Sequence, residues 1–354
     1  MMTKLDRYVA AQMLGAVGLI LLVVVGLDVV FAFVDEAEDL SDTYQVTDLL
    51  YYLMLQIPGQ LYEFLPLASL IGALVGLGVL ASNSELTVMR AAGISINRIV
   101  LAVFKPALIL GVLVMLLGEY IVPKTEQIAE SSRALAQSGG QAIRSKNGIW
   151  HRQGNEFIHI NAVALDGQIF GVTRFQFDED RNLKESSFAA SGDYGDEGWN
   201  LKEVRATELF DDRTQTRTVD AEFWPSELTP ALLSVVVVDP VDLSIQGLWS
   251  YTQYLQEQGL NTDAYQLAFW SKILQPLGIL ALVLVAVSFV FGPLRSVTVG
   301  QRIIAGVIVG LVFKFSQDLL APASSILGFT PLLASLLPIA ICFVIGGLLL
   351  RRAG

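Results

Sequence analysis

The chain lacks the residues from which several common kinds of site are built. Its single cysteine, Cys342, lies in the last apolar run, so neither an internal disulfide nor a thiolate metal cluster can form. Its two histidines, His151 and His159, fall on expected strands, where we expect them to bond to neighbours rather than to zinc. No G-x-x-x-x-G-K-[ST] or G-x-S-x-G motif is present. We therefore expect a chain that is not an enzyme and binds no metal or cofactor itself.

Charged residues are also scarce. They make up 16% of the 354 residues, whereas 53% are hydrophobic, and the mean hydropathy is +0.55. This composition is too apolar for a soluble protein of this length. The net charge of -11 argues against nucleic acid as a partner. The composition predicts an integral membrane protein with a separate soluble part.

Six apolar runs approach the roughly 20 residues that a helix needs to cross a bilayer. They lie at about 12–34, 61–80, 99–122, 268–291, 303–320 and 331–350. A long polar segment separates the third run from the fourth. The predicted fold class is a membrane α-helical protein with six transmembrane helices, three plus three, and an inserted domain between them.

The basic residues of the short loops indicate the orientation, since such loops carry Lys and Arg on the cytoplasmic side. One side of the membrane collects the basic residues of the short loops and of the chain ends: Lys4, Arg7, Arg90, Arg98, Arg295, Arg302, Arg351 and Arg352. The loop at 35–56, on the other side, carries acids and no basic residue. Both termini are therefore expected in the cytoplasm, and segment 123–267 outside, which is the periplasm of a bacterium with two membranes.

Segment 123–267 has the composition of a solvated domain, with well over half of the acidic residues of the chain. It contains six or more short stretches of alternating polar and apolar residues, separated by turn residues, which predict a sandwich or a jelly roll. A short helix at about 243–258 leads back to the membrane, where Trp270 and Lys272 are expected at the interface. The predicted domains are 1–122 with three transmembrane helices, 123–267 with the β-jelly roll and helical connections, and 268–354 with three more transmembrane helices.

Leu80 to Val100 is a polar interruption between the second and third spans that has a helical pattern. Asn83 or Ser84 is expected to cap a short helix at about 82–94, and Gly93 to end it. One reading is a tight cytoplasmic turn with solvated charges. The other is a coupling helix, a protruding knob through which a soluble ATPase moves a membrane subunit.

Charged residues in the outer halves of the spans indicate a second candidate site, because such residues usually face a partner or a cavity. They are Asp28, Glu63, Glu119, Lys314 and Asp318. Lys314 and Asp318 are four residues apart and could simply pair with each other. Alternatively, the cluster and Arg133 line an outward-facing cavity for an amphiphile with phosphates, whose acyl chains meet residues such as Phe31.

Glycines with G-x-x-x-G spacing occur in the second span, at Gly72, Gly76 and Gly78, and in the fifth, at Gly306 and Gly310. This spacing lets helices approach closely. Packing within the chain is the expected use, and contact with a partner subunit is the alternative.

Several stretches resemble one family of membrane proteins. They are LGVLASNSELTVMRAAGIS at 77–95, AYQLAFWSKILQPL at 264–277, SFVFGPLRSVTVGQR at 288–302 and the closing LLLRRAG. Together they are similar to the LptF/LptG family of lipopolysaccharide-export permeases over the whole chain, and FGPLRS is closer to its LptG branch than to its LptF branch. The alternatives are an LptF-type subunit and a secondary lipid transporter, although the latter would be expected to hold its acids near mid-membrane.

The resemblance implies a subunit of an ABC transporter that extracts lipopolysaccharide from the bacterial inner membrane and passes it to a periplasmic β-jelly-roll bridge. The implied partners are an LptF-like permease, two LptB-like ATPases that hold ATP and Mg, and the jelly-roll proteins LptC and LptA. Lateral entry of the lipid is implied between span one of one permease and span five of the other.

The resemblance also assigns roles to individual residues. Glu85 matches the acid of the family's coupling helix that docks on the ATPase, and Leu86, Met89, Arg90 and Gly93 belong to the same motif. Arg133 matches a basic position where family members contact phosphates. Family members can carry lysines at the outer end of span one, but this chain has acids such as Glu38 and Asp39 there. Those acids could bind divalent cations that bridge to phosphate, or the basic side could come from the LptF subunit.

Overall fold

The computed structural model describes residues 4–137, 149–163, 167–178, 180–195, 198–210, 212–226, 228–230, 233, 240–257, 261–292 and 297–353. Arg295 and most of the FGPLRS motif lie outside these residues. The chain divides into two compact units. The first comprises Met1–Val30, Ile57–Ile121 and Asp263–Gly354, and the second comprises Phe31–Gln56 and Val122–Thr262. The second unit contains the sheet and also the outer turns of the first two long helices.

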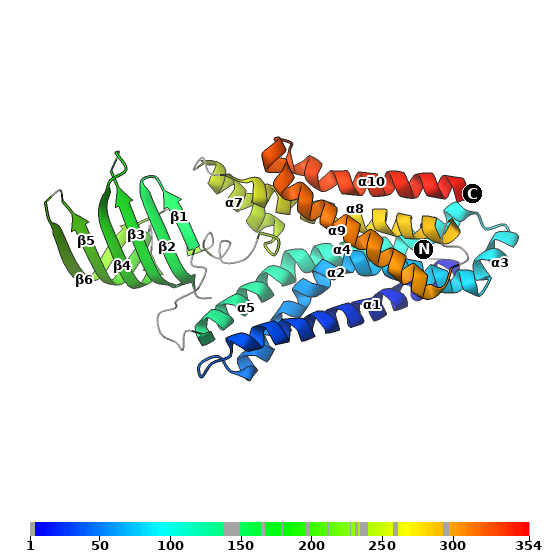
Figure 1. The fold of residues 1–354 in the computed structure, drawn as a ribbon, viewed down its shortest axis with the longest axis horizontal. Helices are drawn as coiled ribbons and strands as arrows, with labels where there is room; N and C mark the ends of the chain where they lie inside the picture. Colours follow the sequence, from blue (N-terminus) through cyan, green and yellow to red (C-terminus); the bar gives the residue numbers. More distant parts are fainter. Residues whose placement is uncertain are drawn as a thin grey trace. The chain divides into compact units, whose positions relative to one another are not determined.

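Six helices are long and apolar enough to cross a membrane, and their order along the chain is traced in Figure 1. They are α1 (Lys4–Glu36), α2 (Val46–Ser82), α4 (Ile96–Leu116), α8 (Asp263–Phe291), α9 (Val299–Leu327) and α10 (Pro331–Ala353). Shorter helices complete this set: η1 (Ala37–Asp39), α3 (Glu85–Ala91), the π-helical turn η2 (Leu117–Ile121), α5 (Val122–Gln137) and α7 (Ile245–Glu257). The fold class predicted from the apolar runs, three plus three transmembrane helices around an inserted β domain, is confirmed.

The helices extend well past their apolar runs. The 37 residues of α2 span about 55 Å at 1.5 Å per residue, whereas the hydrocarbon core is about 30 Å thick. The apolar run at 61–80 therefore marks only the lipid-covered part of α2. The preceding turns, at 46–60, mix apolar residues with a few polar ones and prolong the same helix.

Prolines inside these helices leave backbone carbonyls without a helical donor, and the neighbouring helix supplies one. Pro66 in α2 has no N–H to offer the carbonyl of Tyr62, four residues before it. The Nε2 amide of Gln275 on α8 donates to that carbonyl at 3.3 Å. Such compensation is what allows a proline within a transmembrane helix.

Glycines fix the closest helix contacts. A Cβ atom at Gly76 would lie 2.9 Å from the carbonyl oxygen of Gln12 on α1, and one at Gly306 would lie 2.8 Å from Leu74 on α2. Gly72 likewise lies against Val17 of α1. These glycines therefore pack α1 and α9 against α2, as expected from their spacing. Packing within the chain is confirmed as their use.

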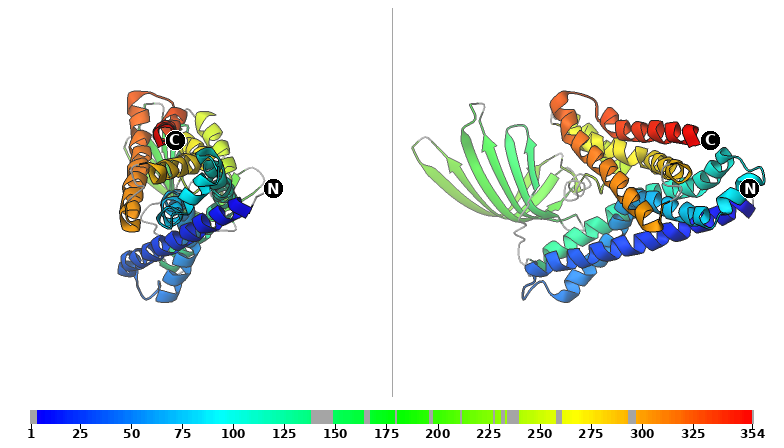
Figure 2. Two further views of the ribbon diagram at one scale, coloured as in Figure 1. Left: turned by 90° about the vertical axis from the view of Figure 1, so that its right-hand side faces the viewer. Right: turned by 45° about the vertical axis from the view of Figure 1, so that its right-hand side comes forward.

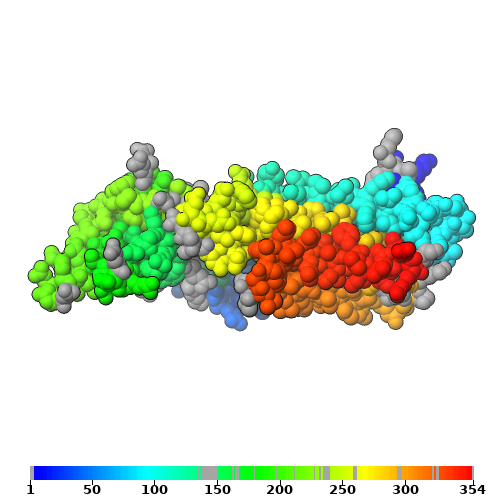
Figure 3. Space-filling model, turned by 90° about the horizontal axis from the view of Figure 1, so that it is seen from above, coloured from blue at the N-terminus to red at the C-terminus, as the bar shows by residue number. Residues whose placement is uncertain are grey.

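The last helices of the chain pack beside one another. Helix α10 contacts both α8 and α9, and Figure 3 shows α9 and α10 running side by side on one face of this unit. Small residues of α10 face α8: the Gly346 backbone lies against Leu284 and Val285, and Ala334 is buried.

The second unit holds six strands: β1 (Ile149–Gln153), β2 (Glu156–Val163), β3 (Ile169–Phe177), β4 (Leu183–Tyr194), β5 (Gly198–Leu209) and β6 (Thr214–Pro225). They correspond to the six alternating stretches of the sequence. Each strand pairs antiparallel with the next, in the order β1-β2-β3-β4-β5-β6. Among the described residues the strands form a single curved sheet (Figure 2), not the two facing sheets of a sandwich.

The curvature of the sheet brings distant strands together on its concave side. Arg174 of β3 lies 2.5 Å from Glu156 and 3.4 Å from Glu222 of β6. In a flat sheet β3 and β6 would be about 14 Å apart, three strand spacings. Backbone irregularities with positive φ at Gly171 and Glu203 accompany the bend. The sheet is therefore curved enough for the Arg174 side chain on β3 to reach β6.

The concave side is filled by the protein itself. Trp199 is fully buried, and its indole N–H donates to the Leu228 carbonyl at 2.7 Å. Leu228 and Leu233, which follow β6, are fully buried as well. Leu228 thus lies against Trp199 and contributes to the core of the sheet.

A histidine joins this domain to α7. His151 on β1 is buried and lies 2.8 Å from the Tyr254 hydroxyl, as expected for a histidine bonded to a neighbour. Burial lowers the pKa of His151 below its ordinary value. The folded protein therefore resists protonation of this ring more than the unfolded chain does.

We expect acid to loosen α7. The His151 contribution to stability is complete above the unfolded-state pKa of about 6.5 and is lost as the pH falls through the lower folded-state pKa. Amide exchange of α7 in the full chain, corrected for intrinsic pH dependence, should accelerate at acid pH. His151→Gln should abolish that acid-dependent change, while the control His159→Gln keeps it. Equal acid dependence in all three proteins would exclude this role for His151.

Candidate functional site

The first candidate site is α3, the short helix between α2 and α4. It begins at Glu85, directly after a turn at Asn83 and Ser84, and ends at Ala91. Ser84 occupies the N-cap position but has a φ of 62°, and its side chain makes no capping hydrogen bond. The expected side-chain cap is therefore wrong, and the helix is shorter than the predicted 82–94. The left-handed turn at Ser84 redirects the chain instead of prolonging α2.

The other end of α3 agrees with the expected glycine stop. Gly93 has a φ of +88°, which an L side chain rarely adopts. Its N–H donates to the Arg90 carbonyl at 3.0 Å, and the Ile94 N–H donates to the Met89 carbonyl at 3.1 Å. This pair of bonds is the Schellman motif that closes many helices.

Helix α3 has both buried and solvent-exposed side chains. Leu86 is 5% exposed and Met89 is partly buried, so these two attach the helix to the protein. Val88 is 66% exposed, and Arg90 is also exposed, on a different side of the helix. The helix therefore presents an apolar residue and a basic one to the solvent.

Glu85 is held by the first helix of the chain. The Tyr8 hydroxyl of α1 donates to Glu85 Oε2 at 2.8 Å. Two residues earlier, the fully buried Asp6 pairs with Arg98 at 2.6 Å and also with Lys105, both on α4. This pairing could not be predicted from the sequence, because it depends on which helix lies beside α1.

The second candidate site involves Arg133 of α5. Its guanidinium lies 2.5 Å from Glu36 and 3.2 Å from Asp39, and 5.2 Å from the centre of the Tyr52 ring. Two acids of the departing 35–42 segment therefore neutralise the cation that the resemblance assigns to phosphate. Tyr44, in the loop between η1 and α2, also contacts Glu36. Burial, followed by the negative charge of Glu36, raises the pKa of Tyr44 to about 12.

Lys314 of α9 makes an ion pair with Glu63 of α2 instead of with Asp318 on its own helix. The simple pairing of Lys314 and Asp318 is therefore wrong. Both partners of the observed pair are about half exposed, and Asp28 lies near enough to Glu63 for the two carboxylates to repel. This is a charged cluster on three helices of the first unit, as the sequence suggested.

The predicted substrate residues thus fall in both compact units. Asp28, Lys314 and Asp318 belong to the first unit, and Phe31 and Arg133 belong to the second. Phe31 is 68% exposed on α1, and Asp318 is exposed on α9. The C-terminal part of α1 therefore offers an exposed aromatic side chain, as an acyl-chain contact requires.

Lys272, near the start of α8, is a basic residue buried within the helical unit. Lys272, expected at the membrane interface, is 3% exposed within the first unit. Its ammonium lies 5.2 Å from the centre of the Tyr62 ring, and Gly118 in η2 leaves room for both side chains. The side chain is covered by Tyr62 of α2 and by η2, which the pattern of α8 itself does not reveal, and the expected interfacial position of Lys272 stays a prediction.

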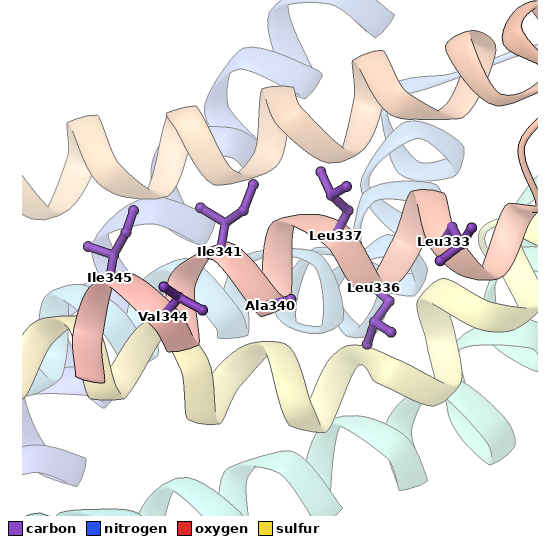
Figure 4. Close-up of a pocket in the computed structure, with 7 residues that line it drawn as sticks. All are labelled: Leu333, Leu336, Leu337, Ala340, Ile341, Val344 and Ile345. Carbon is purple, nitrogen blue, oxygen red and sulfur yellow. The ribbon is translucent and has the colours of Figure 1, made fainter. Parts of the chain in front are cut away.

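A shallow apolar groove of about 420 Å³ runs along α10. Figure 4 shows Leu337 and Ile341 projecting from one side of the helix and Leu336 from the other, with the short Ala340 side chain between them. The residues that line it are all apolar, so nothing in the groove would orient a ligand. It has the properties of a lipid-facing surface and lies apart from both candidate sites in sequence.

Comparisons with known proteins agree with this architecture. The family described as lipopolysaccharide export system permease LptF/LptG matches residues 7–352. The chain is 37% identical to the lipopolysaccharide export system permease protein LptG of Escherichia coli K12, over 98% of both chains. It is also 37% identical to the protein of the same name from Haemophilus influenzae, over 99% of both chains.

The chain therefore belongs to the LptF/LptG family of permeases. Its function is that of a transmembrane permease subunit in lipopolysaccharide export, as the sequence predicted. The two relatives just named are LptG proteins, which agrees with the FGPLRS motif and favours the LptG branch over the LptF alternative.

We expect Gly93→Ala to destabilise the end of α3, because alanine at positive φ costs on the order of 1 kcal/mol. Amide exchange in α3 should become about fivefold faster, whereas Thr87→Ala, on the exposed face of the same helix, should leave the end of α3 intact. If Gly93→Ala exchanges at the parent rate, the positive φ of this residue does not hold the helix end.

Proposed function

We propose that this chain extracts lipopolysaccharide from the inner membrane by transmitting the work of a separate ATPase through α3. The observation that carries the proposal is the geometry of α3: a short, well-terminated helix between two spans, with exposed Val88 and Arg90 and with Glu85 at its start. A plain connecting turn would not need a helix with a defined outward face.

The proposed assembly contains this chain, an LptF-like permease and two LptB-like ATPases, which bind the ATP and Mg. LptC-like and LptA-like jelly-roll proteins receive the lipid. The names of the relatives, which refer to an export system, support an assembly of this kind. Exposed apolar side chains along α1 and α9, such as Leu22 and Val312, support lateral contact with a second permease.

The proposed orientation has both termini and α3 in the cytoplasm and the sheet in the periplasm. Its support is the clustering of Arg90, Arg98, Arg351 and Arg352 at the α3 ends of the helices, together with the acidic 35–42 segment at the opposite ends. In this orientation the charged outer cluster faces the periplasmic half of the membrane.

The proposed lipid contacts are Asp28, Phe31, Arg133, Lys314 and Asp318. Arg133 and Lys314 are each paired with acids of this chain, so a phosphate must displace or bridge those acids. Divalent cations are one means of bridging, and basic residues of the LptF-like subunit are another. Either way, the basic residues are held in place before the lipid arrives.

For the coupling role, we expect Glu85→Ala to lower lipid-stimulated ATP turnover of the purified complex about tenfold, since a lost charged contact at an interface is worth about 1.5–3 kcal/mol. Membrane insertion should be intact. Thr87→Ala is the matched control on the same helix. Co-purification with a P-loop ATPase is the accompanying requirement. If Glu85→Ala turns over like the parent, or if the chain purifies without an ATPase, the coupling role is wrong.

For the lipid contact, a photoreactive residue at Phe315, next to Lys314, reports on lipopolysaccharide binding. Glu63→Gln removes the competing carboxylate and should raise the crosslinking yield about threefold, as expected for a half-exposed ion pair. Lys314→Gln should lower it, and Gln301→Ala, at the other end of α9, should not change it. Equal yields from Glu63→Gln, Lys314→Gln and the parent would remove Lys314 from the lipid site.

A secondary lipid transporter is the competing function. It would use intramembrane acids for ion coupling and would transport without an ATPase. Transport by the permease pair alone in vesicles with an ion gradient would favour it over the proposal.

A further inference from the structure

The first turns of α1 are attached at two points to the segment that contains α3. Tyr8 donates to Glu85, the first residue of α3, and Asp6 pairs with Arg98, two residues into α4. The two contacts therefore lie on either side of α3 along the chain. A movement of α3 relative to the bundle must either carry the start of α1 with it or break these contacts.

The two attachments differ in strength. Asp6 is fully buried with two cations beside it, so separating it from them would leave an uncompensated buried charge. Tyr8 is 42% exposed, and its hydroxyl donates one hydrogen bond to Glu85. The Asp6 contact is therefore a fixed anchor, and the Tyr8 contact is the one that can respond to a load on α3.

The remainder of α1 explains why its start matters. The buried residues of its inner half follow one helical face, at Val9, Met13 and Val17, and pack on Gly72 and Gly76 of α2. Between residues 18 and 30 only Val25 is buried. The inner half of α1 is thus held by the bundle, while the middle of the helix has few contacts within its own unit.

We propose that Tyr8 is a positioning residue that sets the Glu85 carboxylate and transmits the movement of α3 directly to α1. The inference rests on the proposed coupling function and deepens it. Tyr8 occupies Oε2 of Glu85 and leaves Oε1 for a contact with the ATPase. A load on Glu85 then pulls on the start of α1 as well as on α2 and α4.

The test is a double-mutant cycle in the assembled complex, read as the ratio of lipid-stimulated to basal ATP turnover. Tyr8→Phe removes only the hydroxyl and should lower the ratio about threefold in the parent. In the Glu85→Ala background the same change should have no further effect. In the Glu85→Gln background, whose amide oxygen still accepts a hydrogen bond, Tyr8→Phe should again lower the ratio.

Arg7→Gln is the matched control, because Arg7 is the exposed neighbour of Tyr8 and should leave the ratio unchanged. The yield and melting temperature of the complex are measured for every variant. A purely structural role for Tyr8 would lower the yield or the melting temperature without changing the ratio in a manner that depends on residue 85.

The outcomes separate the two proposals. If Glu85→Ala itself has no effect on the ratio, the coupling function fails and this inference fails with it. If Glu85→Ala lowers the ratio but Tyr8→Phe does not, or if the two effects simply add, the coupling function stands and the role of Tyr8 is overturned.

Discussion

Ion pairs between helices determine how the helical part of this protein packs, because a charge near or within the bilayer needs a partner. A charged side chain at the centre of a bilayer costs about 2.5–3.5 kcal/mol or more. Asp6 is met by Arg98 and Lys105 of α4, and Lys314 of α9 is met by Glu63 of α2. These partners come from other helices, so each pair also determines which helices lie side by side.

The same requirement governs polar groups of the backbone. Arg302 is 1% exposed and donates to the Gly78 carbonyl of α2 at 2.6 Å, just as Gln275 serves the carbonyl freed by Pro66. A Cβ atom at position 78 would lie 2.5 Å from the guanidinium, so any other residue there would require Arg302 to move. Close packing at glycines and cross-helix polar contacts therefore hold the first unit together, in the absence of a hydrophobic drive between helices.

Two regions of the permease differ in how their charged residues are held. The inner ends of α1, α3 and α4 are joined by charged contacts, which suits a region that receives force. The outer cluster of Asp28, Glu63 and Lys314 is half exposed and carries excess negative charge, which suits a region that exchanges partners. The proposed mechanism uses the first region to alter the second through the length of α1.

Much of this architecture could be predicted from the sequence because it depends on local patterns. The six apolar runs, the six alternating stretches and the short helix before Asp263 all correspond to elements of the structure. Gly93 could be recognised as a helix end because a left-handed residue is a local requirement. The cap at Ser84 failed because the chain turns there through a left-handed residue.

The contacts of the candidate sites could not be predicted, because they depend on tertiary neighbours. Nothing in α9 distinguishes Glu63 from Asp318 as the partner of Lys314, and nothing in α8 shows that Lys272 is covered by Tyr62. The resemblance pointed to Arg133, but its ion pairs with Glu36 and Asp39 could not be predicted from the sequence. The acids of the 35–42 segment were the available hint, since they are candidate partners for a nearby cation.

The central claim is that α3 and the start of α1 move together. Spin labels at Ala11 and Thr87, exposed positions on α1 and α3, measure it most directly in the assembled complex with and without trapped ATP. The claim predicts that the distance between these two labels stays the same, while the distance between labels at Leu22 and Leu348 changes. A change between Ala11 and Thr87 as large as that between Leu22 and Leu348 would contradict it.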